Sequence, residues 1–210
     1  MIKKIIAKRI KLRKKSQVDH QYEIPKIPKQ LLNTESKKDV EYLKYIKGLI
    51  NQMSQDPMTG LYHKQHFQEL EKEPGVFIYI DGDGIKKIND SFGHNAGHAA
   101  IEALARGIKN VMRNKDDVKI TRFGGDEFVV HVKDISIATG VNIGKRILKS
   151  IQDQDVSKTF KGTKDIKEEL SKMPLGASIG VGKTEAEADE ALYKAKSKGR
   201  NRVEFFTKKK

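Results

Sequence analysis

Short apolar runs alternate with amphipathic stretches along the chain after residue 56. Val76–Ile80 is almost continuously apolar, which is typical of a central strand buried on both faces. β-favouring residues on both sides of Gly124-Gly125 predict a hairpin over 118–133, with positive φ at both glycines. The other predicted elements are a helix after Leu61, a short helix from Ile85, helices over about 96–112 and within 136–152, a strand over 175–181, a helix over 185–198 and a strand near 202–206.

This order of elements predicts an α+β fold. The expected architecture is a palm-like, ferredoxin-like β-α-β-β-α-β sheet flanked by helices mainly on one face. On the helix over 96–112, Ala99, Ala100, Leu104 and Ile108 lie on one side and are expected to face the sheet. Residues 153–171 are polar and match neither the helical nor the strand period.

A helical extension is predicted over residues 36–55, ahead of the alternating region at 56–210. Its apolar positions follow 3-4-3 spacing, which is typical of a coiled-coil seam. The helix is either a dimerising stalk or a helix that packs on its own domain. The seam consists of Leu43, Ile46, Ile50 and Met53.

The net charge of +14 is concentrated at the N-terminus, because the first 55 residues hold 14 Lys/Arg and only 5 Asp/Glu. Residues 1–35 form a basic arm and a linker that contains Pro25 and Pro28. The first 15 residues predict either a basic amphipathic helix on an anionic surface, lipid or nucleic acid, or a solvated tail. The absence of cysteine excludes a disulfide scaffold and a thiolate metal site. Because no apolar run approaches the roughly 20 residues of a membrane span, we expect a cytoplasmic protein, peripheral to the membrane if the arm binds lipid.

Two acidic clusters carry the candidate chemistry. Asp126 and Glu127 lie at the hairpin tip, and Asp81 and Asp83 end the buried strand. If that strand pairs with the hairpin, Asp81 and Asp126 can share one Mg²⁺, which prefers one or two carboxylates with phosphate oxygens and water. Solvated turn residues are the alternative interpretation of Asp126 and Glu127.

A calcium-binding EF-hand loop is excluded for the cluster that begins at Asp81. Such a loop needs Asp or Asn at its fifth position, Gly at its sixth and Glu at its twelfth. The chain has Ile85, Lys86 and Phe92 there.

The stretch Gly124-Gly125-Asp126-Glu127-Phe128 resembles the signature of the GGDEF domain, the diguanylate cyclase family. Four more stretches resemble motifs of that family in the same order. They are Asp56-Pro57-Met58-Thr59-Gly60-Leu61-Tyr62; Asp81-Gly82-Asp83 with Lys86, Ile88-Asn89-Asp90 and Gly93-His94; Ser178-Ile179-Gly180-Val181; and Ala188-Asp189-Glu190-Ala191-Leu192-Tyr193-Lys194-Ala195-Lys196 with Gly199-Arg200-Asn201.

The resemblance implies a nucleotidyl-cyclase palm that condenses two GTP molecules into cyclic di-GMP, releases pyrophosphate and acts as a homodimer. It implies Mg²⁺, with Mn²⁺ as an alternative, and it assigns roles to individual residues. Asp81 and Asp126 would hold the metal with the Gly82 carbonyl, and Glu127 would assist a second metal or the 3′-hydroxyl. Phosphate would be bound by the backbone N–H groups of Asp83, Gly84, Ile85 and Lys86. Its charge would be neutralised by Lys86, Lys196 and Arg200. Asn89 would bind the guanine edge.

Three departures from the family pattern qualify these roles. Gly82 and Gly84 replace bulky apolar residues, which predicts a more flexible phosphate loop. His98 stands where a second guanine-contacting Asp is usual, which leaves open relaxed or ATP-containing base choice. Arg113 and Asp116 resemble the Arg-x-x-Asp inhibitory site with a longer spacing to Gly124, and a helix-end charge pair is the alternative. A non-catalytic nucleotide-binding or scaffold module is the remaining functional alternative.

Overall fold

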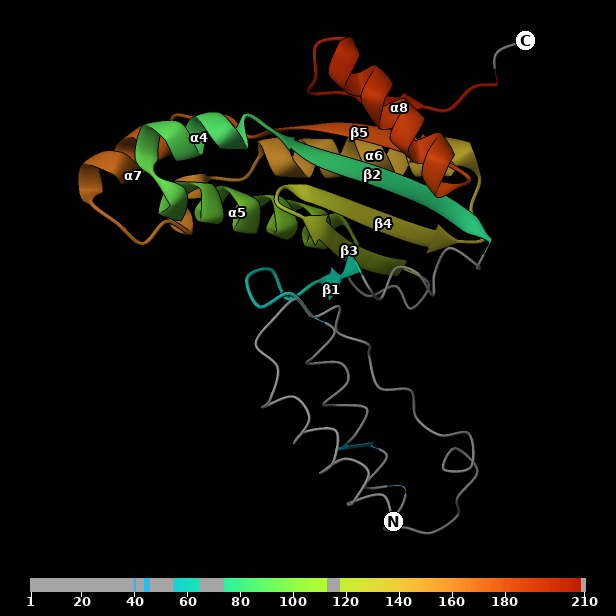
Figure 1. Cartoon of the computed structure of the whole chain (residues 1–210), viewed down its shortest axis with the longest axis horizontal. Coiled ribbons are helices and arrows are strands. Elements are labelled where there is room, and N and C mark those ends of the chain that lie inside the picture. The colour runs from blue at the N-terminus through green and yellow to red at the C-terminus, as the bar shows by residue number, and fades with distance from the viewer. Residues whose placement is uncertain (1–39, 41–43, 46–54, 65–73, 113–117, 209–210) are drawn as a thin grey trace, which may run out of the picture.

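The computed structural model describes residues 40, 44–45, 55–64, 74–112 and 118–208. The described strands form one six-stranded mixed sheet in the order β1-β3-β4-β2-β5-β6. β2 lies between β4 and β5, antiparallel to both, while the outer strands β1 and β6 run parallel to their neighbours (Figure 1). The strands are β1 Tyr62–His63, β2 Gly75–Asp83, β3 Val118–Gly124, β4 Glu127–Lys133, β5 Gly176–Gly182 and β6 Val203–Phe205.

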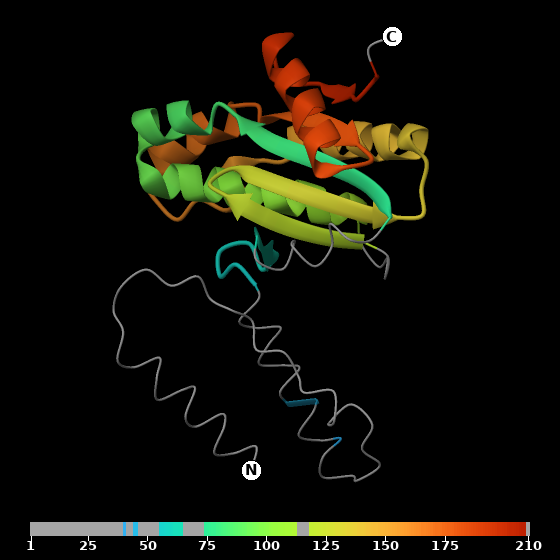
Figure 2. The same ribbon diagram turned by 45° about the vertical axis from the view of Figure 1, so that its right-hand side comes forward.

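Helices cover both faces of this sheet. The views agree that α5 and α6 lie behind it and that α8 crosses in front (Figures 1 and 2). The predicted α+β palm-like sheet is therefore confirmed, and the described helices lie mainly on one face. The helices are α4 Ile85–Phe92, α5 His94–Met112, α6 Ile137–Gln152, the 3₁₀ turn η2 Val156–Lys158, α7 Lys164–Ser171 and α8 Glu185–Ser197.

The central strand β2 is buried on both faces, as its apolar run predicts. Alternate side chains of a strand point to opposite faces, so one set contacts the main core and the other faces α8. Ile78 and Ile80 belong to the main core with Leu104 of α5, whereas Phe77 packs in a second cluster with Leu192 of α8. This double packing fixes the end of β2, where the acidic cluster begins.

Glycine in β5 lets α8 lie directly on the sheet. A Cβ at Gly180 would lie 2.2 Å from the backbone of Ala188 and Leu192, so a larger residue would push the helix away. Thr184 accepts a hydrogen bond from the N–H of Glu187 and caps the start of α8. The position of α8, and of the lysines near its C-terminus, therefore follows from local sequence.

The predicted position of the hairpin turn is wrong by one residue. The turn consists of Gly125 and Asp126, because Gly124 still pairs with Glu127. Both glycines have positive φ as predicted, 159° at Gly124 and 49° at Gly125. A bulge between Arg122 and Gly124 absorbs the extra residue. The chain also forms the short strand β1 immediately after Leu61, before a helical residue at Lys64.

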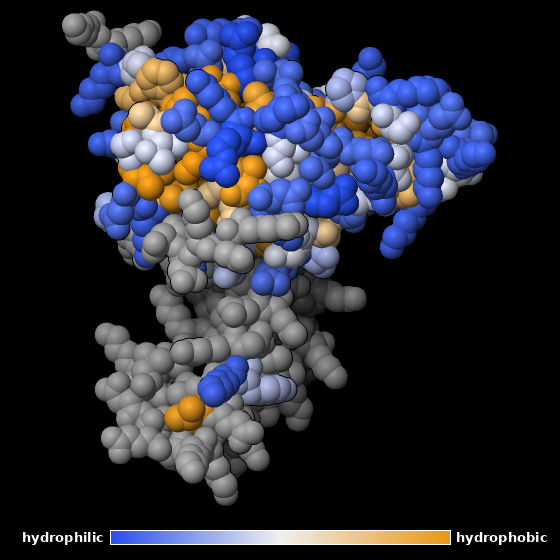
Figure 3. Space-filling view, turned by 180° about the vertical axis from the view of Figure 1, so that it is seen from behind, coloured by the Kyte–Doolittle hydropathy of each residue, from blue (hydrophilic) through white to orange (hydrophobic). Residues whose placement is uncertain are grey.

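The polar stretch 153–171 forms η2 and α7, which the hydrophobic pattern alone did not indicate. Three buried apolar residues, Val156, Phe160 and Leu170, hold this region to the core. The Thr159 hydroxyl donates to the Ala99 carbonyl at 3.1 Å and joins the region to α5. Seen from behind, hydrophobic residues gather on the broad part of the molecule, and the narrow end that contains α7 is hydrophilic (Figure 3).

The basic arm over 1–35 and most of the predicted stalk over 36–55 lie outside the described residues. Within the stalk, Val40, Lys44 and Tyr45 are helical, whereas Gln55 forms a bridge with Tyr62. Among the described residues, no helix is both long and apolar enough to cross a membrane.

Candidate active site

The two acidic clusters meet because β2 pairs with β4. Asp81 lies opposite Glu127 in the register, and the N–H of Gly82 donates to the carbonyl of Asp126 at 3.1 Å. The strand end and the hairpin tip therefore form one edge of the sheet. This pairing is the condition under which Asp81 and Asp126 were predicted to share a cation.

The carboxyl groups of this edge repel each other. Burial raises the pKa of Asp126 above its usual value, and the charge of Asp81 raises it further, whereas a backbone hydrogen bond and, less strongly, the charges of Lys196 and Arg122 lower it. Two carboxylates held together in a partly buried position favour a cation between them. The Asp81 side chain is 16% exposed, and its Oδ2 lies 2.7 Å from Nζ of Lys196.

A divalent metal fits this donor set. Within the described residues, no three or more His, Asp or Glu side chains form a metal-binding group, so the protein carboxylates here are the pair Asp81 and Asp126. Mg²⁺ typically takes one or two carboxylates and completes its shell with water and phosphate, whereas Zn²⁺ prefers three or four protein ligands. The observed pair therefore suits a metal that arrives with a phosphorylated substrate.

Gly82 leaves the room that this pair requires. A Cβ there would lie 2.5 Å from Cδ1 of Leu104 and 3.3 Å from Cβ of Asp126. Gly82 is buried within the β2 ladder, and the expected flexibility of the phosphate loop stays a prediction. Gly84 differs, because it is exposed and has a φ of 79°, a conformation that glycine adopts readily.

The predicted phosphate loop lies at the N-terminus of α4. Gly84 is the N-cap residue and has no side chain to cap the helix, and the N–H of Ile88 is the first to bond back, to the Gly84 carbonyl at 3.2 Å. The N–H groups of Ile85 and Lys86 precede that bond and point out of the helix start, where they suit an anion. Lys86 is exposed beside them.

The carboxylate of Asp83 binds two groups within the protein, whereas the family resemblance implies a role only for the N–H of this residue. Asp83 still belongs to β2, and its Oδ1 accepts from the Ser178 hydroxyl at 2.9 Å. Its Oδ2 accepts from the N–H of Asn201 at 2.9 Å. Asp83 thus joins the end of β2 to the turn that carries Arg200.

That turn contains three consecutive residues with positive φ: Gly199 at 103°, Arg200 at 62° and Asn201 at 46°. The left-handed conformation costs a non-glycine residue about 1–2 kcal/mol, so the surrounding contacts must stabilise it. The N–H of Arg200 bonds to the Ala195 carbonyl at 3.0 Å, and Gln152 donates to the Asn201 side chain at 3.0 Å. The turn leaves Arg200 exposed next to the anchored end of β2.

The predicted base-reading residues lie on α4 and α5. Oδ1 of Asn89 is buried and has no hydrogen-bond partner among the described residues. It packs so closely on Gly97 that a Cβ there would lie 1.8 Å from it. His98 is exposed on the next position of α5, so it is accessible to a ligand.

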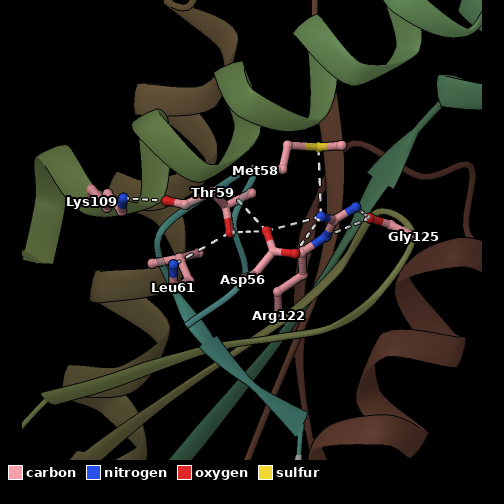
Figure 4. A network of polar contacts seen from close by, with 7 residues as sticks. All are labelled: Asp56, Met58, Thr59, Leu61, Lys109, Arg122 and Gly125. Atoms are coloured by element: carbon pink, nitrogen blue, oxygen red, sulfur yellow. Dashed lines mark hydrogen bonds and ion pairs between the residues drawn. The ribbon is translucent and has the colours of Figure 1, made fainter. Parts of the chain in front are cut away.

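A network that the sequence did not predict supports the hairpin from the side of the Asp56 loop (residues 55–61). Nη1 of Arg122 lies 3.0 Å from both carboxylate oxygens of Asp56, and Nε and Nη2 donate to the carbonyl of Gly125 at 3.0 and 2.7 Å (Figure 4). Arg122 therefore holds the residue that directly precedes Asp126. The sequence signal that could have indicated it is an arginine at the end of β3, just before the two glycines.

The Asp56 carboxylate also accepts hydrogen bonds from within its own loop. The Thr59 N–H and hydroxyl donate to Oδ1 at 2.8 and 2.6 Å, and Lys109 of α5 donates to the Thr59 carbonyl (Figure 4). Burial alone would raise the pKa of Asp56, but these Thr59 bonds and the Arg122 guanidinium together hold it below its usual value. The loop is thus a rigid support rather than a second acidic site.

Most of the predicted residues come together at one edge of the sheet. Asp81, Gly82, Asp126 and Glu127 lie there on β2 and the hairpin, and Lys196 reaches Asp81 from α8. Lys196 was expected to neutralise phosphate, and the structure instead pairs it with a candidate metal ligand. Arg113 and Asp116 lie outside the described residues.

Residues 53–202 match the family profile "Diguanylate cyclase, GGDEF domain". The chain belongs to the GGDEF family. It is 34% identical over 172 residues to the uncharacterized protein YhcK of Bacillus subtilis, covering 73% of this chain and 46% of YhcK. It is 32% identical over 178 residues to diguanylate cyclase A of Treponema denticola, covering 74% of this chain and 45% of that protein. The chain thus spans about half the length of these relatives.

Solved GGDEF structures share the fold. The coiled coil and GGDEF domain of DgcB from Caulobacter crescentus, in complex with c-di-GMP, has a TM-score of 0.66 at 22% identity, covering 80% of this chain and 94% of that one. The GGDEF domain of TpbB (YfiN) from Pseudomonas aeruginosa has a TM-score of 0.60 at 26% identity, covering 73% and 94%. The recognition of the GGDEF family from the sequence motifs is confirmed.

Proposed function

We propose that this GGDEF domain condenses two GTP molecules into cyclic di-GMP and releases pyrophosphate. In each half-reaction the 3′-hydroxyl of one nucleotide attacks the α-phosphorus of the other. The observation that carries the proposal is the pairing of Asp81 with the Asp126 hairpin, which gives a cation site at the edge of the sheet beside the N-terminus of α4. A relative named diguanylate cyclase A supports the same activity.

The chain's own residues bind and orient the substrate in this proposal. Asp81 and Asp126 hold Mg²⁺ or Mn²⁺, with the Gly82 carbonyl as a further donor, and the bound ion supplies charge neutralisation at the reacting phosphate. The N–H groups at the start of α4 bind phosphate oxygens. Positioning and charge account for most of the catalysis of phosphoryl transfer, so no covalent intermediate is required.

The remaining polar residues have supporting roles. Lys86 on α4 and Arg200 in the turn anchored by Asp83 are exposed, and they neutralise the triphosphate. Asn89 contacts the guanine edge from α4. Glu127, directly after the metal-binding turn, activates the 3′-hydroxyl or assists a second ion.

The reaction needs two protomers, because one site binds one nucleotide and two nucleotides are joined symmetrically. The stalk over 36–55 is the segment proposed to bring them together. Specific activity should therefore fall on dilution, and deletion of residues 1–50 should make that fall steeper. Light scattering on the same samples identifies the dimer, and constant activity per protomer in a monomeric sample would contradict the requirement.

Incubation with each NTP and Mg²⁺, followed by mass identification of the product, tests the activity directly. The expected product is cyclic di-GMP from GTP. If the intact protein forms no cyclic dinucleotide from any NTP but binds GTP, the chain is a nucleotide-binding module and the proposal is wrong.

A second candidate function is a cyclase with relaxed base choice, and the exposure of His98 on α5 favours it. Guanine presents two donors, N1–H and the exocyclic amine, which an ionised Asp accepts well, whereas neutral His offers one ring acceptor. Loss of a charged acceptor weakens discrimination by about 1.5–3 kcal/mol, which is roughly ten- to hundredfold. In competition with equal GTP and ATP, the native protein should incorporate ATP and the His98→Asp variant should exclude it. Equal exclusion by both proteins would mean that His98 does not read the base.

A further inference from the structure

Two lysines near the end of α8 form ion pairs of the same length with different kinds of partner. Nζ of Lys194 lies 2.7 Å from Glu190 of the same helix. Nζ of Lys196 lies 2.7 Å from Oδ2 of Asp81, which precedes it by 115 residues. Lys194 thus makes an ordinary contact along a helix surface, whereas Lys196 crosses from the helix to the candidate metal site.

In the structure, the Lys196 ammonium offsets the negative charge of Asp81 at this edge of the sheet. The Asp81 side chain is 16% exposed, so its charge is only partly hydrated, and Lys196 also acts on the charge of Asp126. A divalent ion held by Asp81 and Asp126 would bind the same carboxylate group and would be repelled by the nearby ammonium. Lysine and metal therefore compete for Asp81.

Lys196 also lies where it can serve a phosphate group. Its ion-pair partner, Asp81, is two residues from Asp83, which anchors the Arg200 turn, and three residues from Gly84, the N-cap residue of α4. The lysine side chain has a flexible four-carbon stem and is 34% exposed, so it can leave one oxygen for another without movement of the helix.

We propose that Lys196 is an exchangeable cation of the active site: it neutralises Asp81 before substrate binds and transfers to the triphosphate when a divalent ion occupies the carboxylates. The inference rests on the proposed function, because it assumes that metal and nucleotide bind at this edge. Its consequence is positive coupling. Nucleotide draws the ammonium from Asp81 and favours the metal, and by linkage the metal favours the nucleotide equally.

The test measures binding rather than turnover. Mn²⁺ binding to the nucleotide-free full chain is followed by the electron paramagnetic resonance signal of free Mn²⁺. Binding of α,β-methylene-GTP, whose bridge prevents the loss of pyrophosphate, is followed by calorimetry with and without Mg²⁺. The proteins are the native chain, Lys196→Met and the matched control Lys194→Met.

Lys196→Met should bind Mn²⁺ about three- to tenfold more tightly than the native chain, because it loses a competing ion pair of partly exposed groups. The same variant should bind α,β-methylene-GTP more weakly and should lose most of the mutual enhancement between metal and nucleotide. Lys194→Met should match the native chain in all three measurements, because its ion pair lies along the surface of α8.

Unchanged or weaker Mn²⁺ binding by Lys196→Met would overturn the inference. If cyclic di-GMP still forms in that case, only the exchange is wrong and the proposed function stands. If the native chain binds no Mn²⁺, with or without α,β-methylene-GTP, and forms no product, the proposed function fails as well.

A second measurement uses the native chain alone, so it tests the proposal even if the Lys196→Met variant does not fold. The side-chain NMR signal of Lys196 should shift when Mg²⁺ is added without nucleotide, and the signal of Lys194 should not. Equal behaviour of the two signals would contradict the exchange.

Discussion

The protein holds two aspartates in opposite ways at the two sides of one hairpin. Asp56 accepts two hydrogen bonds from Thr59 and a two-oxygen ion pair from Arg122, and its pKa is lowered. Asp126 is held near a second carboxylate in a partly buried position, and its pKa is raised. Both residues lie against the same hairpin, because Arg122, the partner of Asp56, lies near the end of β3, the strand that leads to the turn.

The difference separates support from function. A carboxylate whose bonds are satisfied within the protein stabilises the fold and has little capacity left for a ligand. A carboxylate that is crowded by another charge opposes folding and is available to a cation. Arg122 connects the two, since it anchors to Asp56 and fixes Gly125, so the stable side determines where the reactive side chain lies.

The largest expected effect is on turnover at the reactive side. Asp126→Asn keeps the size of the side chain but removes a charged metal ligand, so cyclic di-GMP formation should fall by about a thousandfold or more, which is about 4 kcal/mol. Its melting temperature should equal or exceed that of the native chain, because a repulsive charge is lost. Initial rates and thermal melts at neutral pH measure both quantities.

Asp153→Asn is the control for that experiment. Asp153 is the exposed C-cap residue of α6, and its carboxylate lies 2.7 Å from Nζ of Lys149. It is far in sequence from the residues of the site. It should keep full activity. Turnover by Asp126→Asn at the native rate would mean that this carboxylate does not hold the catalytic cation.

The supporting side should show the reverse pattern. Asp56→Asn leaves the Arg122 guanidinium without a charged partner in a position where both side chains are only 12% exposed, so the free energy of unfolding should fall by about 3 kcal/mol. Urea unfolding gives the value. Asp153→Asn, whose ion pair is shorter but whose side chains are 73% and 57% exposed, should lose less than about 1 kcal/mol. Equal losses in the two variants would show that burial does not distinguish these ion pairs.

The sequence predicted the reactive side better than the supporting side. Asp81 and Asp126 could be found because each follows a strand signal with adjacent glycine, and local pattern indicates where a strand ends. The bonds of Arg122 to Asp56, of Asp83 to Ser178 and of Lys196 to Asp81 join residues separated by 66, 95 and 115 positions. No local period encodes such contacts, because they depend on which strands become neighbours in the sheet.

Local pattern also limited the fold prediction at two places. The two glycines predicted the turn, yet a bulge moved the turn one residue toward Asp126, because strand register is set by pairing along the whole hairpin. The stretch 153–171 lacks a period because a few buried anchors, including Phe160 and Leu170, hold it rather than a continuous apolar face.

Asp83 stabilises the fold and also positions the turn that carries Arg200. Asp83→Asn keeps one acceptor oxygen for two donors, Ser178 and the N–H of Asn201, so stability should fall by about 1–2 kcal/mol. Because the Arg200 turn loosens, KM for GTP should rise more than kcat falls. Asp155→Asn, which alters a carboxylate that accepts from the Ser157 N–H at 2.9 Å in η2, should leave KM unchanged. An unchanged KM in Asp83→Asn would mean that the turn does not position a substrate-binding group.

The smallest effect expected is a difference in pH dependence between the two sides. The pKa of Asp56 is lowered from 3.8, so its contribution to stability is complete above that value and is lost as pH falls through the lowered pKa. The pKa of Asp126 is raised from 3.8, so its protonated form favours the fold and stability is lost as pH rises through the raised pKa. On acidification, the native chain should therefore lose stability relative to the Asp56→Asn variant. It should gain stability relative to the Asp126→Asn variant. Urea unfolding of the three proteins between pH 7 and the acid limit of folding measures the two slopes, and slopes of the same sign would show that the two carboxylates are not held in opposite ways.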